Sequence, residues 1–269
     1  MIDKICVVVP VHTSTPSDYE LVSFRQCFAI LGKHPIKLVA PAGLDVARYK
    51  EVVPQLDLVF IDPKWQSSLL GYNQLKTSRY FYNIFAQYEF ILTYELDAFV
   101  FKDELDHWCR KGYDYIGAPW FVGFGTPAPG ASLHGVGNSG FSLRRVSPIA
   151  KVLKEIYYKN PSEYQTDKKS LFKAYLKAPY RWFKNQLGEN YTVQNSGLYE
   201  DRFFGEVVPI FSKTFVVAPI AEAIKFSFEV QPEILFQLNN EKLPMGCHAW
   251  WKYNFEFWKP FIKDFGYTL

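Results

Sequence analysis

No stretch of this sequence approaches the roughly 20 consecutive apolar residues of a membrane-spanning helix, so no such helix is expected. The N-terminus also lacks the pattern of a secretory signal peptide, because its short apolar run already ends at Pro10. Only four cysteines occur, none in a Cys-x-x-Cys pair, which argues against a zinc knuckle and favours reduced thiols. We therefore expect a cytoplasmic protein that is free in solution or attached to the inner face of a membrane.

The sequence also has little net charge. Its formal charge is +3, too small to indicate nucleic-acid binding by itself. In contrast, 48% of the 269 residues are hydrophobic and 18% are aromatic. This composition excludes a disordered chain, and the length suffices for one domain with a sizeable core. The aromatic excess suits both core packing and surfaces on which sugars stack.

Apolar periodicity predicts alternating strands and helices in the first hundred residues. The predicted strands are residues 4–11, 36–40, 58–61 and 90–96, and the predicted helices are residues 17–31, 45–53 and 72–87. This order implies an α/β fold with a mostly parallel central sheet and helices on both faces.

The pattern changes after Asp97, and the second half mixes shorter elements with a long Gly/Pro-rich loop at 120–137. Helices are expected at 103–111, 147–158 and 200–208, and strands at 113–116, 138–145 and 214–217. We expect one domain over 1–269, with a nucleotide-binding half at 1–101 and an acceptor-binding half at 102–269.

Two carboxylates end the fourth predicted strand, Glu95 and Asp97, with Tyr94 before them. Ligands of open α/β sheets bind beyond the carboxyl ends of the strands. Side chains two residues apart on an extended chain point the same way, so these carboxylates can share one divalent cation that grips a diphosphate. The alternative is a strand-ending Asp that caps the next turn.

A glycine-rich segment, residues 135–140 (GVGNSG), matches Gly-x-Gly-x-x-Gly literally. A strand pattern follows it instead of a helix, which is the wrong context for a dinucleotide fingerprint. It is either a loop where the backbone approaches a ligand closely or a plain glycine turn.

The pair Glu200 and Asp201 opens a predicted helix. These acids are either favourable partners of the positive helix end or a general base over the site.

His248 is a further candidate, as a structural histidine or as a nitrogen ligand beside the carboxylate pair, where it would suit manganese better than calcium.

Residues 151–190 are basic, with nine Lys and Arg against four acids. Aromatic and basic residues alternate within a predicted insertion at about 160–190. Such a segment either contacts an anionic membrane, here through residues 165–187, or forms a solvated helical hairpin.

Five segments taken together have a pattern more specific than any one motif. They are residues 94–100 (YELDAFV), 113–120 (YDYIGAPW), 137–144 (GNSGFSLR), 200–204 (EDRFF) and 248–250 (HAW). In this order they resemble a family of GT-A-like glycosyltransferases that is catalogued as a domain of unknown function. The resemblance covers roughly residues 4 to 251 without the insertion. It implies the GT-A-like, nucleotide-diphospho-sugar transferase fold.

The resemblance also implies roles for individual residues. Asp97 would be a direct ligand of Mn²⁺ or Mg²⁺ and His248 a second one, while Glu95, where the family more often has Asp, would act with the donor diphosphate. Asp201, with Glu200 as second choice, occupies the place of the catalytic base in inverting enzymes. The implied donor-binding residues are Pro10, Val11, His12, Thr13, Tyr72, Asn73, Lys76 and Arg79, and the implied sugar- and acceptor-binding residues are Trp120, Asn138, Ser139 and Gly140.

The predicted function is therefore transfer of a sugar from a nucleotide sugar, a UDP-sugar by the habit of the fold, to a glycan or lipid-linked hydroxyl with inversion. Two alternatives are a non-catalytic domain that binds carbohydrate or a nucleotide sugar, and a metal-dependent nucleotidyltransferase. The latter is disfavoured because no Gly-rich loop followed by Lys comes after the first strand to cradle a triphosphate.

Overall fold

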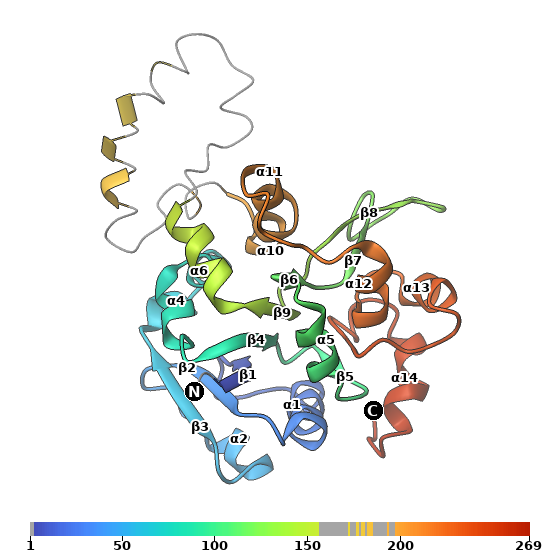
Figure 1. The fold of residues 1–269 in the computed structure, drawn as a ribbon. Helices are drawn as coiled ribbons and strands as arrows, with labels where there is room; N and C mark the ends of the chain where they lie inside the picture. Colours follow the sequence, from blue (N-terminus) through green and yellow to red (C-terminus); the bar gives the residue numbers. More distant parts are fainter. Residues whose placement is uncertain are drawn as a thin grey trace.

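The computed structural model describes residues 3–155 and 197–269, and between them only positions 172, 176, 177, 179, 180, 182–184 and 193. The described residues surround one central sheet with helices on either side (Figure 1). Most of the predicted insertion at about 160–190, with its predicted membrane contact, lies outside the described residues.

The central sheet has six strands in the order β3-β2-β1-β4-β9-β6. The first four are parallel, and β9 runs antiparallel between β4 and β6. Their bounds are β1 Asp3–Pro10, β2 Ile36–Pro41, β3 Asp57–Ile61, β4 Tyr88–Tyr94, β6 Tyr115–Ile116 and β9 Phe141–Arg145. A mostly parallel sheet, as predicted, is confirmed, and the carboxyl ends of β1 and β4 lie at one edge.

Helices cover both faces of the central sheet. Successive side chains of β1 point to opposite faces and pack into two separate cores. Ile5 and Val7 pack with α1 Asp18–Leu31, α2 Ala47–Val52 and α5 Leu105–Lys111. Cys6 and Val8 pack with α3 Leu69–Lys76, α4 Arg79–Ile84 and α6 Val146–Glu155. The predicted α/β class is thus confirmed. All four cysteines are free and buried, and no helix among the described residues is long and apolar enough to cross a membrane.

The prediction of a single helix over residues 72–87 is wrong, because this region contains two separate helices, α3 and α4. Thr77 and Ser78 lie between them, and their hydroxyls donate to the carbonyls of Asn73 and Leu75. The Ser78 hydroxyl then accepts from the backbone N–H of Phe81 and so begins α4. Hydroxyls that bond nearby backbone groups end one helix and cap the next.

Two further predictions in the second half are wrong. The predicted loop 120–137 contains a hairpin of β7 Pro119–Phe121 and β8 Leu133–Val136. The predicted strand at 214–217 makes only an isolated bridge between Tyr115 and Val217. The helix predicted at 200–208 runs as α10 Glu200–Arg202, a π-helical turn η2 Phe203–Val207 and α11 Val208–Phe211.

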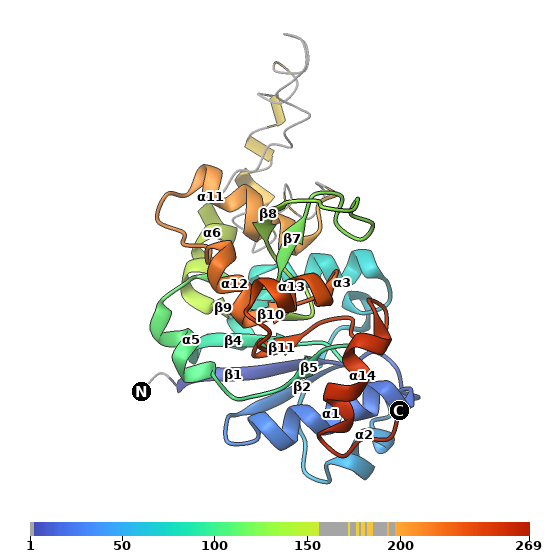
Figure 2. The same ribbon diagram turned by 90° about the vertical axis from the view of Figure 1, so that its right-hand side faces the viewer.

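The aromatic C-terminal part brings distant residues to the edge of the sheet. Strand β11 Gly246–Cys247 pairs with β5 Phe99–Val100, so His248 lies beside the turn that follows β4. A third core, which includes Phe99, Trp250 and Trp258, holds these strands against α1 and α14 Phe255–Lys263 (Figure 2). The remaining elements are η1 Pro63–Trp65, α12 Ile220–Phe226, β10 Ser227–Phe228 and α13 Pro232–Leu238.

Candidate functional site

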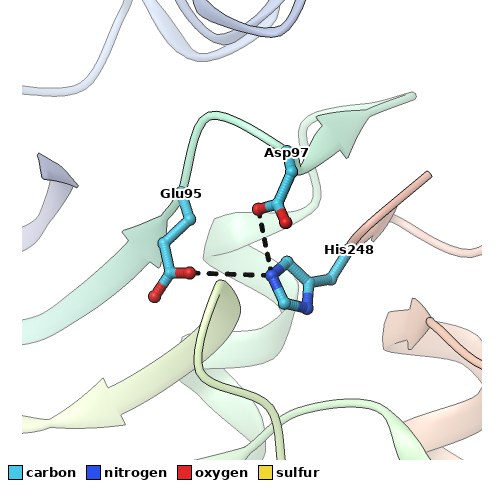
Figure 3. A group of neighbouring side chains, drawn as sticks. All are labelled: Glu95, Asp97 and His248. Atoms are coloured by element: carbon cyan, nitrogen blue, oxygen red, sulfur yellow. Dashed lines mark ion pairs between the residues drawn. The ribbon is translucent and has the colours of Figure 1, made fainter. Parts of the chain in front are cut away.

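Three side chains that could hold a metal ion meet at the carboxyl end of β4. Glu95 and Asp97 follow this strand, and His248 follows β11 (Figure 3). The His248 Nε2 atom lies 3.0 Å from Asp97 Oδ1 and 3.6 Å from Glu95 Oε2. One ligand atom from each residue lies within 4.8 Å of the others, so the arrangement could hold one divalent cation.

The orientation of His248 fits a metal ligand. Its Nδ1 atom lies 2.9 Å from Glu229 Oε1, whereas its buried Nε2 has no hydrogen-bond partner in the described part of the chain and faces the carboxylates of Asp97 and Glu95. Burial lowers the pKa of His248, but the carboxylates of Asp97 and Glu229 outweigh it and raise that pKa well above its ordinary value. The position of Nε2 therefore strongly favours a cation, and a carboxylate on the far ring nitrogen is the usual partner of a metal-bound histidine.

Glu95 presents one oxygen to the same point because its other oxygen is fully used. Its Oε1 accepts from Tyr72 Oη (2.8 Å), Lys76 Nζ (2.6 Å) and Ser139 Oγ (2.9 Å). Burial raises the pKa of Glu95, but Lys76 and His248 together hold it well below its usual range. Glu95 Oε2 is thus an ionised oxygen that faces His248, and the structure groups Glu95 with the metal ligands rather than with the donor-binding residues alone.

Gly140 explains part of the glycine-rich motif. A Cβ atom at this position would overlap the imidazole of His248. The Gly140 carbonyl also accepts from the backbone N–H of Glu95 (2.8 Å). Only glycine allows the backbone this close to the candidate metal centre.

Glu229 was not singled out from the sequence, because it directly follows a two-residue strand and no motif surrounds it. Its carboxylate accepts from Asn138 Nδ2 (2.9 Å) and contacts His248 Nδ1. Glu229 therefore links the predicted acceptor-binding residue Asn138 to the candidate ligand His248.

We expect Glu229→Gln to weaken Mn²⁺ binding about 10–100-fold, because the neutral amide no longer fixes the imidazole. Isothermal titration with Mn²⁺ measures the change. Glu233→Gln is the matched control, since Glu233 is exposed and contacts Asn254 on the surface. Equal Mn²⁺ affinity of Glu229→Gln and the control would contradict the role given to Glu229.

A cavity of about 480 Å³ adjoins the candidate metal centre. Its lining includes Pro10 and His12 beyond the end of β1, and Tyr72, Glu95 and Asp97. Of the other residues predicted at the end of β1, Val11 is buried in the core, and Thr13 accepts a hydrogen bond from Tyr49 through its carbonyl. The cavity wall also includes Glu20, Gln66 and Trp251, which no motif indicated.

A second cavity, of about 210 Å³, shares Leu69, Tyr72 and Glu95 with the larger one. We call it the inner chamber. Six residues singled out from the sequence line it together with Glu95 and His248. They are Tyr72, Asn73, Lys76, Ser139, Glu200 and Asp201.

Other predicted site residues lie outside the linings of both cavities. Arg79 begins α4, and Trp120 is buried with its ring against Gly137. Asn138 is buried, and besides its bond to Glu229 its Oδ1 accepts from the backbone N–H of Phe141 (2.7 Å). Asn138 therefore reaches the candidate metal centre through Glu229, and neither Asn138 nor Trp120 lines these two cavities.

Glu200 and Asp201 border the inner chamber in different environments. Glu200 is buried and forms ion pairs with Arg144 Nη2 (2.7 Å) and Lys76 Nζ (3.3 Å). Asp201 accepts from the backbone N–H of Arg202 (2.7 Å). Burial and the negative charge of Glu200 raise the pKa of Asp201 to about 7, which suits a general base near neutral pH.

Comparison with known protein families assigns residues 55–248 to a family described as "Protein of unknown function (DUF5672)". The chain belongs to this family. The matched region of this DUF5672 protein includes all three candidate metal ligands and the whole lining of the inner chamber. Among curated proteins, none matches the chain.

Solved structures of glycosyltransferases are similar to this DUF5672 protein. One is the galactosyltransferase LgtC in complex with donor and acceptor sugar analogues, with 13% identity, 96% of this chain and 95% of that chain covered, and a TM-score of 0.48. Another is mouse xyloside xylosyltransferase 1, with 11% identity, 91% and 97% covered, and a TM-score of 0.46.

Proposed function

We propose that this DUF5672 protein is a metal-dependent glycosyltransferase of the GT-A kind. It transfers a sugar from a nucleotide sugar, with UDP as the first candidate, to a hydroxyl of a glycan or lipid-linked acceptor, with inversion. The main support is the place of Glu95, Asp97 and His248, at the end of β4 and between two adjoining cavities.

The larger cavity suits the nucleotide part of the donor. It lies beyond the carboxyl ends of β1 and β4, where open α/β sheets bind their ligands. Its volume of about 480 Å³ is within the range of small-molecule binding sites. Glu95 Oε2, Asp97 and His248 Nε2 would hold Mn²⁺ or Mg²⁺. When bound, that ion would stabilise the negative charge on the departing diphosphate as a Lewis acid.

The inner chamber suits the reacting sugar and the acceptor hydroxyl. Asp201 takes the hydroxyl proton while the new bond from oxygen to the anomeric carbon forms and the bond to the diphosphate breaks. Glu200, held by Arg144 and Lys76, is poorly placed to move a proton. Asp201 is therefore the base in this proposal, and Glu200 has a different role.

A panel of nucleoside diphosphates and nucleotide sugars, each with Mn²⁺ and with chelator, tests the proposal through the melting temperature. We expect one nucleotide to raise it only with metal, because a ligand of the folded state stabilises that state by mass action. NMR of the product anomer then tests inversion. No shift with any nucleotide would favour the carbohydrate-binding alternative, and release of pyrophosphate from a triphosphate would favour the nucleotidyltransferase.

We also propose that the protein acts at the inner face of a membrane. The described positions within 165–187 include exposed Phe172, Leu176, Tyr180 and Trp182, which suit an interfacial segment. We expect the intact protein to co-sediment with anionic liposomes more than a variant without residues 165–187. Equal sedimentation of the two proteins would contradict the membrane contact.

A further inference from the structure

The inner chamber has two adjacent acids, and two cations hold only one of them in place. Arg144 Nη2 lies 2.7 Å and Lys76 Nζ 3.3 Å from Glu200 Oε1, and all three side chains are buried. Arg144 is also held by Tyr82 Oη (3.1 Å) and Ser142 Oγ (3.0 Å). Such a network holds the Glu200 carboxylate in one position between two cations, so Glu200 is poorly placed to exchange a proton with a substrate.

Asp201 lies next to this fixed anion. Its Oδ1 accepts from the backbone N–H of Arg202, and Asp201 lines the inner chamber, where the proposed function places the acceptor hydroxyl. Charged groups of several elements face or border Asp201. They are Glu200 and Arg202 of α10, Lys76 of α3, Glu229 after β10, and Glu95 and His248 across the inner chamber.

We propose that Glu200 is a positioning residue whose fixed negative charge makes Asp201 the stronger proton acceptor of the pair. The inference rests on the proposed function, since it takes Asp201 as the base of the transfer. A like charge close by disfavours ionisation of a carboxyl group, so the bound proton is held more tightly. Two acids whose environments differ in this way divide their roles, one as an anion and one as the group that exchanges the proton.

Glu200→Gln removes the charge, and we expect it to increase transfer at low pH and to decrease transfer at high pH. The titration midpoint of Asp201 falls by about one pH unit or more, so transfer begins at lower pH. The maximal rate at high pH falls several-fold, because a weaker base removes the hydroxyl proton less well. A purely structural role of Glu200 would lower the rate without moving the pH dependence.

The decisive measurement is the titration of the Asp201 side-chain carboxyl by ¹³C NMR, without nucleotide, with the signal assigned by its loss in Asp201→Asn. We expect a midpoint near 7 in the wild type, a downward shift of one unit or more in Glu200→Gln, and no shift in Glu206→Gln. Glu206 is the matched control, because it lies on the same helical run and pairs with the exposed Arg202.

A wild-type midpoint near 4, or equal midpoints in the wild type and Glu200→Gln, would overturn the proposal. If Glu200→Gln does not fold by circular dichroism, Glu200→Asp replaces it, since it keeps the anion but moves it by one methylene. Because the anion is kept, the Asp201 midpoint should stay well above 4 in Glu200→Asp, and a midpoint near 4 in this variant would count against the coupling. The expected titration without sugar transfer to any acceptor would overturn the proposed function while the coupling between the two acids stands.

Discussion

Replacing Asp97 by alanine will abolish the stabilisation of the protein by a nucleoside diphosphate with Mn²⁺. Asp97 Oδ1 lies 3.0 Å from His248 Nε2, and without it only two of the three candidate ligands remain. A ligand at a hundred times its Kd stabilises the folded state by about 2.7 kcal/mol, which corresponds to several degrees in Tm. We expect this metal-dependent shift to be lost in Asp97→Ala.

Asp264→Ala is the control for this experiment. Asp264 is exposed at the end of α14 and lines neither cavity, and its loss removes the same charge. The control should keep the full shift with nucleotide and Mn²⁺. A full metal-dependent shift in Asp97→Ala would remove Asp97 from the candidate metal centre and with it the main support for the proposed function.

Replacing Asp201 by asparagine will lower sugar transfer about 10³-fold or more while nucleotide and Mn²⁺ binding stay intact. The asparagine oxygen can still accept from the backbone N–H of Arg202, so the local backbone is preserved, but the side chain no longer takes a proton. Single-turnover transfer measures the rate, and the Tm shift with nucleotide measures binding. Wild-type turnover in Asp201→Asn would assign the base elsewhere or indicate a retaining mechanism.

The raised pKa of Asp201 also fixes the direction of two pH effects. Transfer by the wild type should rise with pH through about 7, as Asp201 loses its proton. The folded state binds this proton more tightly than the unfolded state, so its contribution to stability is present at low pH and is lost as pH rises through about 7. Urea unfolding should therefore show Asp201→Asn gaining stability relative to the wild type between pH 5 and 8. No relative gain would contradict the raised pKa.

The local parts of the site were predictable from the sequence. Strand β4 is mostly apolar and is buried at six of its seven positions, and Glu95 and Asp97 directly follow its end. The capping box of Ser17 and Glu20 likewise marks the start of α1 within the chain itself. Such features depend on a few neighbouring residues, which is why sequence patterns identify them.

The rest of the site depends on pairing between distant segments. Glu229 lies 19 residues before His248, and it reaches the imidazole only because β10 and β11 are parallel neighbours. The division of roles between Glu200 and Asp201 depends on Arg144, which lies 56 residues earlier in the chain. Adjacent acids look alike in a sequence, and only the cations around one of them distinguish the two.

The burial of Lys76 determines when an amine-reactive reagent can reach its side chain. Its side chain is 1% exposed, and its ammonium contacts Glu95, Ser139 and Glu200, which come from three separate parts of the chain. An amine-reactive reagent will modify surface lysines at once, but it can reach Lys76 only when these segments separate. The rate of Lys76 acylation therefore reports how often the inner chamber opens locally, and this measurement does not require the substrate to be known.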